Sequence, residues 1–256
     1  AFAALRSDGS VVSWGNYGGY RYGVAAALNN SSNRVTQIFS NGGAFAALRS
    51  DGSVVTWGDS SYGGDSTAVT AALNTSSNKV TQIFSTECAF AALRSDGSVV
   101  TWGNSSYGGD SSAVTTALNN SSNKVTQIFS TGSAFAALRS DGSVVTWGDS
   151  SWGGNSSSVA TALAGGSNKV TQIFSNSGAF AALRSDGSVV TWGHSDYGGN
   201  SSAVAAALNN SSNKVTQIFS TGSAFAALRS DGSVVTWGYY GGNSSAVTAA
   251  LNNSSN

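Results

Sequence analysis

Short apolar segments alternate with polar turns along the whole chain, and their spacing predicts β-strands. In one example, Phe45 to Arg49 and Val54 to Trp57 flank the sequence Ser-Asp-Gly-Ser at 50–53. An Asp-Gly pair between two apolar runs is a strong signal for a β-hairpin with a type I′ turn, in which both central residues have positive φ. Val80 to Ser85 alternates Val, Gln and Phe with Thr, Ile and Ser and is rich in β-branched residues. It therefore predicts a third strand.

The segment between a hairpin and the next third strand predicts a short helix. Residues 63–66 read Gly-Gly-Asp-Ser, which is typical of a turn that leads into a helix N-terminus, and an alanine-rich run follows. The alternative is an outer fourth strand, which Val69 and Thr70 would tolerate. Polar segments such as Asn-Asn-Ser-Ser-Asn at 119–123 predict loops.

The whole pattern repeats, and the repeat accounts for every residue of the chain. The phrase Ala-Phe-Ala-Ala-Leu-Arg-Ser-Asp-Gly-Ser-Val-Val-(Ser/Thr)-Trp-Gly begins at Ala1, again 43 residues later at Ala44, and then every 45 residues up to Ala224. Val-Thr-Gln-Ile-Phe-Ser occurs five times against six hairpin phrases, so the sixth unit is expected to lack its third strand. We expect a single repeat domain, residues 1–256, composed of the units 1–43, 44–88, 89–133, 134–178, 179–223 and 224–256.

A unit of this size cannot bury both faces of its sheet and must stack on its neighbours. Small residues such as Ala44 and Ala46 are interleaved with Phe45, Leu48 and Trp57, a mixture that suits sheets packed face to face. The predicted fold is all-β with short helices. A closed six-bladed β-propeller is favoured, because closure removes exposed strand edges and neither end looks like a polar capping repeat. An open β-rich solenoid is the alternative.

The repeat resembles that of the regulator of chromosome condensation family. The resemblance rests on the aliphatic strand at 35–38, the Leu-x-x-Asp-Gly turn at 48–52, the Trp-Gly pair at 57–58 and the following glycine-bearing loop, and it covers the chain unit by unit. It implies a β-propeller. The chain differs from the family pattern in having Ala-Phe where a His precedes the apolar strand, no Gln in the glycine loop, a shorter unit and no proline. The exchange activity of the founding member depends on surface loops that are not recognisable here, so the resemblance does not extend to that activity.

Charge and composition exclude several classes of function. The 256 residues include 12 basic and 12 acidic side chains, so no net field exists to attract nucleic acid or an anionic membrane. Apolar runs are only a few residues long, whereas a membrane-spanning helix needs about 20. The single cysteine, Cys88, excludes an internal disulfide framework and a Cys-rich zinc site. No nucleic-acid partner and no membrane span are therefore expected.

The repeat is rarely interrupted by reactive side chains, as a catalytic site would require. His194 stands where other units have Asn, Asp or Tyr, so it is expected at a solvated loop position. Cys88 occupies a position that Gly or Ser holds in other units, and we expect it to be a small filler rather than a nucleophile. No catalytic triad, carboxylate pair or phosphate-binding loop is recognised. We expect no enzyme activity and no cofactor.

Two further features are interpreted structurally. Asp59 and Asp65 lie near a Gly-Gly pair, but their spacing matches no known calcium motif and Asn replaces Asp in other units, so no metal site is expected. Arg49 and Asp51 are two residues apart, as are their equivalents, and we expect a local ion pair across the turn. A ring of such arginines that binds anions is the alternative.

The best candidates for ligand binding lie in the glycine-bearing loops. An aromatic ring flanked by Gly-Gly and by Asp or Asn offers a stacking face and hydrogen-bonding groups, which suits a sugar ring or a partner's side chain. The alternative is that these rings pack beneath the loops. The candidates are Tyr62, Asp65, Tyr107, Asp110, Trp152, Asn155, Tyr197 and Asn200, with Tyr17 and Tyr240 as offset equivalents of the aromatic residues.

These features favour a non-enzymatic scaffold that displays six near-identical loops for multivalent binding of a protein or a surface. One alternative is a lectin-like carbohydrate binder that uses the same loops. Another is a subunit of an extracellular filament or surface assembly, joined through the edge left open in the incomplete sixth unit. Asn-x-Ser/Thr sequences favour an extracellular or cell-surface location. They begin at Asn30, Asn74, Asn104, Asn120, Asn155, Asn200, Asn210 and Asn243.

Overall fold

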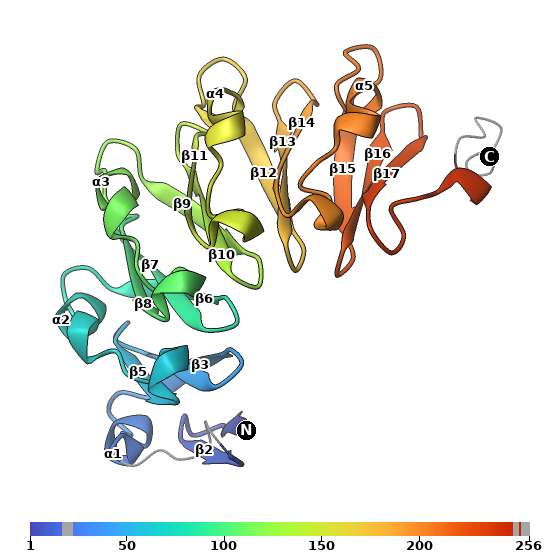
Figure 1. The fold of residues 1–256 in the computed structure, drawn as a ribbon. Helices are drawn as coiled ribbons and strands as arrows, with labels where there is room; N and C mark the ends of the chain where they lie inside the picture. Colours follow the sequence, from blue (N-terminus) through green and yellow to red (C-terminus); the bar gives the residue numbers. More distant parts are fainter. Residues whose placement is uncertain (17–22, 248–250, 252–256) are drawn as a thin grey trace. The chain divides into compact units, whose positions relative to one another are not determined.

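The computed structural model describes residues 1–16, 23–247 and 251. They belong to two compact units, Ala1–Ile128 and Phe129–Asn256. In both units, short antiparallel sheets follow one another along the chain and are joined by helical segments (Figure 1). The prediction of an all-β chain with short helices is therefore confirmed.

Each hairpin phrase forms two strands. The first strands are β1 (Phe2–Leu5), β4 (Ala44–Arg49), β7 (Ala89–Arg94), β10 (Ala134–Arg139), β13 (Ala179–Arg184) and β16 (Ala224–Arg229). The second strands are β2 (Val11–Trp14), β5 (Val54–Gly58), β8 (Val99–Gly103), β11 (Val144–Gly148), β14 (Val189–Gly193) and β17 (Val234–Gly238). The Val-Thr-Gln-Ile-Phe-Ser segments form β3 (Val35–Ser40), β6 (Val80–Ser85), β9 (Val125–Ser130), β12 (Val170–Ser175) and β15 (Val215–Ser220).

The described strands form five three-stranded sheets and one two-stranded sheet. The three-stranded sheets have the orders β3-β4-β5, β6-β7-β8, β9-β10-β11, β12-β13-β14 and β15-β16-β17, and the two-stranded sheet is β1-β2. Where β3 pairs with β4, Ile38 lies opposite Ala47 and Phe39 lies opposite Ala46. The same register recurs in β6-β7, β12-β13 and β15-β16.

Each third strand joins the hairpin that follows it in the chain, not the hairpin that precedes it. The expectation that the sixth unit lacks its third strand is therefore wrong. β15 completes the sheet of the last hairpin, and the two-stranded sheet among the described residues belongs to the first hairpin. The alternation of residues identifies this strand but not its partner, because a hairpin phrase lies on both sides of it in the sequence.

The hairpin turn differs from the predicted type I′ turn. The Gly52 N–H donates to Arg49 O, and the Arg49 N–H donates to Ser53 O, both at 2.9 Å. Ser50 and Asp51 are thus the central residues of the turn, and Gly52, with a φ of 83°, follows them. This is a three-residue connection with one left-handed glycine. The Asp-Gly pair serves this turn because the Asp side chain accepts hydrogen bonds within it.

An asparagine from the preceding loop holds the tip of this hairpin. Asn33 Nδ2 donates to Asp51 Oδ2 at 2.7 Å, while Asn33 Oδ1 accepts hydrogen bonds from Ser50 Oγ and Asp51 N. The hydroxyl and N–H of Ser53 donate to Asp51 Oδ1. Partial burial acts to raise the pKa of Asp51, but these hydrogen bonds and the Arg49 guanidinium outweigh it and hold the pKa below the usual 3.8.

Acidification is expected to destabilise the hairpin turns. The pKa values of Asp51, Asp96, Asp186 and Asp231 all lie below 3.8 in the folded chain. A carboxyl group whose pKa is lowered by folding stabilises the folded state fully when the pH is above its unfolded-state pKa. This stabilisation is lost as the pH falls through the folded-state pKa. Urea unfolding should show a free energy of unfolding that falls as the pH is lowered below about 4, and falls less in Asp51→Asn. A free energy that stays constant over this range would contradict these carboxylate contacts.

The segment between a hairpin and the next third strand is helical, as predicted, and not a fourth strand. Its helix is one turn of 3-10 helix followed by one turn of α-helix, as in Thr67–Val69 and Thr70–Leu73. The α-helices are α1 (Ala25–Leu28), α2 (Thr70–Leu73), α3 (Thr115–Leu118), α4 (Ala160–Leu163) and α5 (Ala205–Leu208). The 3-10 turns are η1 (Ser60–Tyr62), η2 (Thr67–Val69), η3 (Ser105–Tyr107), η4 (Ser112–Val114), η5 (Ser150–Trp152), η6 (Ser157–Val159), η7 (Ser195–Tyr197), η8 (Ser202–Val204) and η9 (Ser245–Val247).

Successive sheets pack face to face within each unit. In the first unit, Ala46 and Leu48 of β4 share a buried cluster with Leu73 of α2 and with Phe90 and Trp102 of the next sheet. The alanines of one sheet leave room for the aromatic rings of the next. In the second unit the equivalent cluster contains Ala181, Leu183, Leu208, Phe225 and Trp237.

Candidate functional site

The glycine-bearing loops are folded tightly against the ends of the hairpins. Asp59 Oδ1 accepts a hydrogen bond from Ser61 N at 2.8 Å, and Asp59 O accepts one from Gly64 N at 2.8 Å. A Cβ atom on Gly64 would lie 2.4 Å from the backbone of Gly58. The loop has no room for a side chain at this position, which explains the second glycine of the Gly-Gly pair.

The candidate aromatic residues lie half-buried beneath these loops. Tyr62 packs against the backbone at 42–43, where a Cβ on Gly43 would lie 2.8 Å from the ring. The Tyr62 carbonyl also accepts a hydrogen bond from Asn41 Nδ2 at 2.7 Å. One face of the ring is thus used for packing, and a ligand could reach only the remainder. Tyr107, Trp152 and Tyr197 are also half-buried, Tyr240 is exposed, and Tyr17 lies outside the described residues.

The acidic and amide candidates have a structural role in the same loops. Asp65, Asp110, Asn155 and Asn200 each accept a hydrogen bond from the backbone N–H two residues further on, at the start of a 3-10 turn. The N–H groups that they bind hold the pKa of Asp65 and that of Asp110 below 3.8. All four side chains are exposed, so a ligand could still contact them.

His194 lies in an aromatic cluster and is half-buried, so the loop position expected to be solvated is only partly so. Its ring centroid is 5.5 Å from that of Trp152 and 5.3 Å from that of Tyr197, and its Nδ1 is buried. The substitutions at the position of His194 could not reveal this cluster. One of its members, Trp152, lies in the preceding unit, where it replaces the tyrosine of the other loops. In the part of the chain that the structure describes, no group of three or more His, Cys, Asp or Glu side chains could hold a metal ion.

Cys88 is half-buried in the connection between a third strand and a hairpin. Burial, together with the charges of Glu87 and Asp59, raises the pKa of its thiol above the usual 9.0. The thiolate is the reactive form of cysteine, so the raised pKa makes Cys88 a poor nucleophile at neutral pH.

The repeated arginines contact the hairpin turns through serine. Arg94 Nε donates to Ser98 Oγ at 2.8 Å, and the Ser98 hydroxyl in turn donates to Asp96 Oδ1. Arg184 makes the same contact with its own serine at 2.8 Å. The predicted pairing of Arg with Asp across the turn therefore includes a bridging hydroxyl group.

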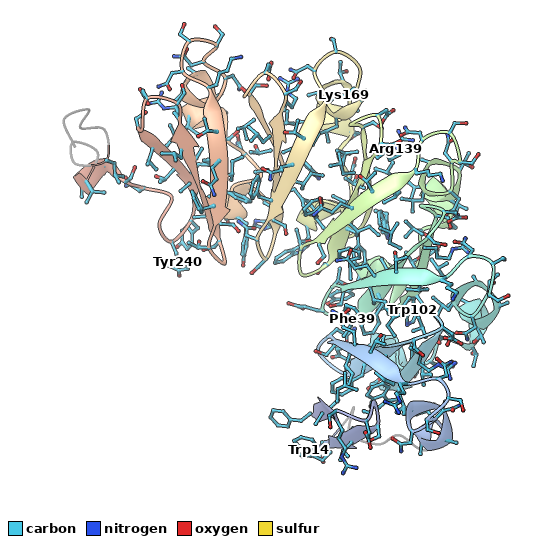
Figure 2. The ribbon with its side chains drawn as sticks, turned by 180° about the vertical axis from the view of Figure 1, so that it is seen from behind. Trp14, Phe39, Trp102, Arg139, Lys169 and Tyr240 are labelled. Carbon is cyan, nitrogen blue, oxygen red and sulfur yellow. The ribbon has the colours of Figure 1, made fainter. Side chains whose placement is uncertain are left out.

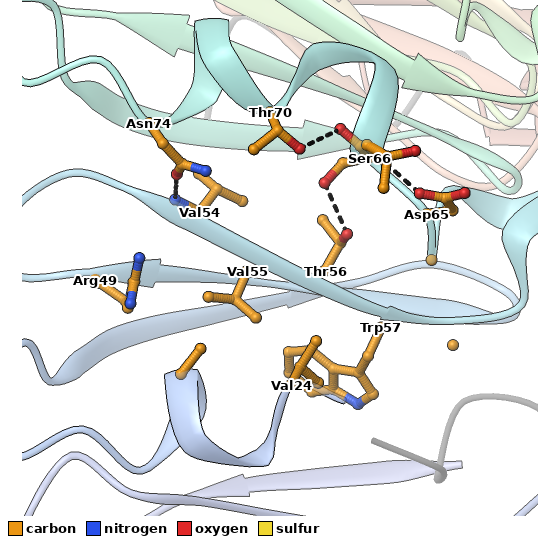
Figure 3. Close-up of a pocket in the computed structure, with 14 residues that line it drawn as sticks. Val24, Arg49, Val54, Val55, Thr56, Trp57, Asp65, Ser66, Thr70 and Asn74 are labelled. Atoms are coloured by element: carbon orange, nitrogen blue, oxygen red, sulfur yellow. Dashed lines mark hydrogen bonds between the residues drawn. The ribbon is translucent and has the colours of Figure 1, made fainter. Parts of the chain in front are cut away.

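A groove lies beside the second strand of a hairpin in the first unit. It has a volume of about 490 Å³ and lies beside β5, between the start of α1 and the loop that leads into α2 (Figure 3). Val24, Val55 and Trp57 line its apolar side, and Asp65 and Ser66 line its polar side. The groove thus offers an apolar surface next to hydrogen-bonding groups.

Hydrogen bonds fix the polar side of this groove (Figure 3). Thr56 Oγ1 and Ser66 Oγ are 2.9 Å apart, and Thr70 Oγ1 donates to Ser66 O at 3.0 Å. At the beginning of β5, the Val54 N–H donates to Asn74 Oδ1 at 2.9 Å. These hydrogen bonds hold the polar side of the groove in place.

The same groove recurs at equivalent repeat positions. A groove of about 520 Å³ in the second unit is lined by Val159, Val190, Asn200 and Ser201, which correspond to Val24, Val55, Asp65 and Ser66 three repeats earlier. Two further grooves lie beside the second strand of the next hairpin in each unit, and they share Asp65 and Ser66, or Asn200 and Ser201, with the first two grooves. Val69 and Trp102 line the one in the first unit, and Val204 and Trp237 line the one in the second.

The sequence-based candidates overlap these grooves only in part. Asp65 and Asn200 line them. Thr56, Ser66 and Asn74 also line the first groove but were not identified from the sequence. A polar residue recurs at each of these positions in several repeats. Recurrence alone does not show whether the side chain faces a groove or a neighbouring sheet. Within the described ranges, no helix has the length and apolar character needed to cross a bilayer.

No protein-family model matches this chain, and no curated protein matches it. Several solved structures are similar to it. The ectodomain of the receptor kinase CR4 from Physcomitrella patens is 15% identical, with a TM-score of 0.52 over 95% of this chain and 62% of that chain. The CRINKLY WD40 ectodomain of the Arabidopsis thaliana receptor kinase ACR4 is 17% identical, with a TM-score of 0.51 over 93% of this chain and 76% of that one. Yeast RCC1 (Prp20), bound to Kap60, is 17% identical, with a TM-score of 0.50 over 82% of this chain and 56% of that one.

At these identities the similarity establishes the fold alone. The chain has the repeat fold of β-propeller proteins, as the sequence predicts. It spans less than two thirds of the CR4 ectodomain and of yeast RCC1. The resemblance to the repeats of the regulator of chromosome condensation family is thus supported at the level of the β-propeller repeat.

Proposed function

We propose that the protein is a non-enzymatic repeat scaffold, with residues 1–256 acting as one repeat domain, and that it binds a protein partner through the grooves between its repeats. The observation that carries this proposal is the recurrence of one groove, with the same residue types, at equivalent positions in both units. Its recurrence gives a partner with several matching segments more than one place to bind.

The chemistry of the groove suits a segment of polypeptide. The half-buried Val24, with Val55 and Trp57, which are only 8% and 3% exposed, offers a limited apolar contact, and the nearby Ser66 and Thr70 can hydrogen-bond to a peptide backbone. Asp65 is replaced by the neutral Asn200 in the second unit, so a positively charged partner is not required. Repeated weak sites gain strength when one partner presents several matching segments. Yeast RCC1, which shares the fold, is bound to the protein Kap60 in its structure.

A selection of peptides from a random phage-displayed library tests this proposal. Thr67 and Ser202 are exposed residues that line the first groove and its counterpart in the second unit. In the double variant Thr67→Arg, Ser202→Arg, long charged side chains fill both grooves. We expect the affinity of the selected peptides to fall by about tenfold or more, because a misplaced charge and lost contacts each cost of the order of 1 kcal/mol.

The matched control is Ser76→Arg, Ser211→Arg, which adds the same charge at exposed loop positions, one in each unit. It should bind the selected peptides as the unchanged protein does. Equal binding by the groove variant would contradict the proposal. If binding is lost only when Tyr62, Tyr107, Trp152 and Tyr197 are replaced by Ala, the loop aromatics are the site instead.

Two parts of the proposal concern location and ligand. The exposed sequence Asn-Ser-Ser at Asn120 and at Asn210 supports an extracellular or cell-surface location.

A carbohydrate partner is the alternative to a protein partner, and it would use the exposed part of the loop aromatic residues. Binding to a glycan array that is lost in the loop-aromatic variant would favour this alternative.

A further inference from the structure

The two larger grooves each contain one arginine at the same place of the repeat. Arg49 lines the groove of the first unit, and Arg184, three repeats later, lines its counterpart in the second unit. Figure 3 shows Arg49 at the end of the groove near Asn74, with Asp65 towards the other end. Both arginine side chains are half-buried. A guanidinium group with limited access to water is thus part of each groove.

Much of the hydrogen-bonding capacity of these arginines is unused. A guanidinium group carries five N–H donors. Among the described residues, the Arg184 side chain donates only through Nε, to Ser188 Oγ at 2.8 Å. Nε of Arg49 is buried and has no hydrogen-bond partner in the described part of the chain. Because a buried donor without a partner costs free energy, these groups favour a ligand that accepts hydrogen bonds.

The hairpin turns do not account for these arginines. In both units the serine hydroxyl of the turn donates to the aspartate side chain, as Ser53 does to Asp51. Arg184 contacts the serine of its own turn, and Arg139, which Figure 2 shows at the end of β10, makes the same contact. Nε of Arg49 makes no such contact. The turn thus keeps its hydrogen bonds with or without the arginine, which leaves the guanidinium group for another role.

The charge of the groove favours one carboxylate group over a phosphate group. Guanidinium groups pair well with the oxygen atoms of both. In the first groove, however, the Asp51 carboxylate already interacts electrostatically with Arg49, and Asp65 lies on the polar side. A doubly charged phosphate would therefore meet two acidic side chains and one cation, whereas phosphate-binding sites typically contain a cluster of arginines. A carboxylate side chain brings only one negative charge.

We propose that the grooves recognise an acidic segment of a partner protein, with an Asp or Glu side chain against Arg49 in the first unit and against Arg184 in the second. The inference rests on the proposed function, because it names the class of segment that the same grooves bind. The argument for this occupant is charge complementarity. Arginine is present in both grooves, whereas the acidic Asp65 of the first is replaced by the neutral Asn200 in the second.

Two phage-displayed libraries of octapeptides test this inference. One library has Glu at a fixed central position and the other has Gln there, and neither has Asp or Glu at the random positions. We expect the best peptides with Glu to bind at least about tenfold more tightly than their counterparts with Gln, because a charge-assisted hydrogen bond is stronger than a neutral one. This difference in affinity should disappear in the double variant Arg49→Gln, Arg184→Gln.

The matched control is Arg34→Gln, Lys214→Gln, which removes one positive charge from an exposed position outside these grooves in each unit. It should keep the full preference for Glu. The double variant Arg49→Lys, Arg184→Lys keeps the charge but loses the planar fork of donors, so it should keep part of the preference. Circular dichroism shows whether each variant is folded. If the Gln variant unfolds, the two libraries on the unchanged protein and on the Lys variant still decide.

Three outcomes would overturn the inference. One is equal affinity of the unchanged protein for the peptides of the two libraries. Another is a preference for Glu that persists in Arg49→Gln, Arg184→Gln. The third is tighter binding of a peptide with phosphoserine in place of Glu, which would make a phosphorylated segment the occupant.

Failure of this inference can be told apart from failure of the proposed function. If peptides from the Gln library bind as tightly as those with Glu, and Thr67→Arg, Ser202→Arg abolishes their binding, the grooves bind peptides without a preference for an acidic side chain. If neither library yields a peptide that binds, both the inference and the proposed function are contradicted.

Discussion

Phe90→Ala is expected to destabilise the protein by about 3–5 kcal/mol. Phe90 is completely buried, and its ring stacks on Trp102 with centroids 5.2 Å apart. It also contacts the glycine loop of the preceding repeat, since a Cβ on Gly63 would lie 2.9 Å from its ring. Truncation would leave a cavity at the junction between two sheets, and the surrounding backbone cannot close such a cavity fully.

The matched control for this prediction is Phe2→Ala. Phe2 is the same residue of the repeat and stacks on Trp14 in the same way, but it is 66% exposed. Its truncation should cost less than about 1 kcal/mol, because little apolar surface is returned to water. Urea unfolding followed by circular dichroism measures both values. If the two variants lost the same stability, packing between sheets could not be the main source of stability in this fold.

Gly58→Ala is expected to destabilise the protein by about 3 kcal/mol or more. Gly58 has a φ of 113°, and a Cβ there would lie 2.6 Å from Gly43 O and 2.7 Å from Ala44 Cα. Alanine would therefore strain its own backbone and also push apart the first and second strands of the hairpin. Because the contacted atoms belong to the backbone, no side-chain rotation can relieve the overlap.

Gly232→Ala separates these two effects. Gly232 also has a positive φ, 83°, but a Cβ there would meet nothing within 4 Å. The free energy of unfolding of this variant should fall only by the cost of a left-handed backbone conformation for alanine, about 1–2 kcal/mol. The difference between the two unfolding free energies then measures the steric overlap at Gly58. Equal losses would show that the backbone angle alone requires glycine in this repeat.

The sequence predicted the elements of the fold well, because their signals are local. The alternation in Val80–Ser85 and the apolar runs on both sides of the turn at 50–53 define strands without reference to the rest of the chain. The helix at 67–73 was also predicted, from the alanine-rich run that follows Asp65. Identical repeats strengthened each of these predictions, since one local signal was present several times.

The pairing of these elements and the candidate site could not be predicted as well. Whether β3 joins the hairpin before it or after it depends on packing between sheets, and both neighbours have the same sequence. The role of Tyr62 depended on the glycines at 42–43, which lie about twenty residues away in sequence and have no periodic signal of their own. The place of Ser66 in the groove could not be predicted for a similar reason, because its hydrogen-bond partner Thr56 lies on a different element.

The links between neighbouring repeats span short lengths of chain. Asn33 reaches the hairpin tip at Asp51, and Trp102 Nε1 donates to Gly63 O, 39 residues earlier in the chain. Each repeat can therefore dock as soon as its neighbour has formed, at a modest loop-closure cost. Folding can begin at any pair of adjacent repeats and spread in both directions, as in other repeat proteins. We therefore expect the first docked pair to form most slowly, because every later repeat adds to a surface that already exists.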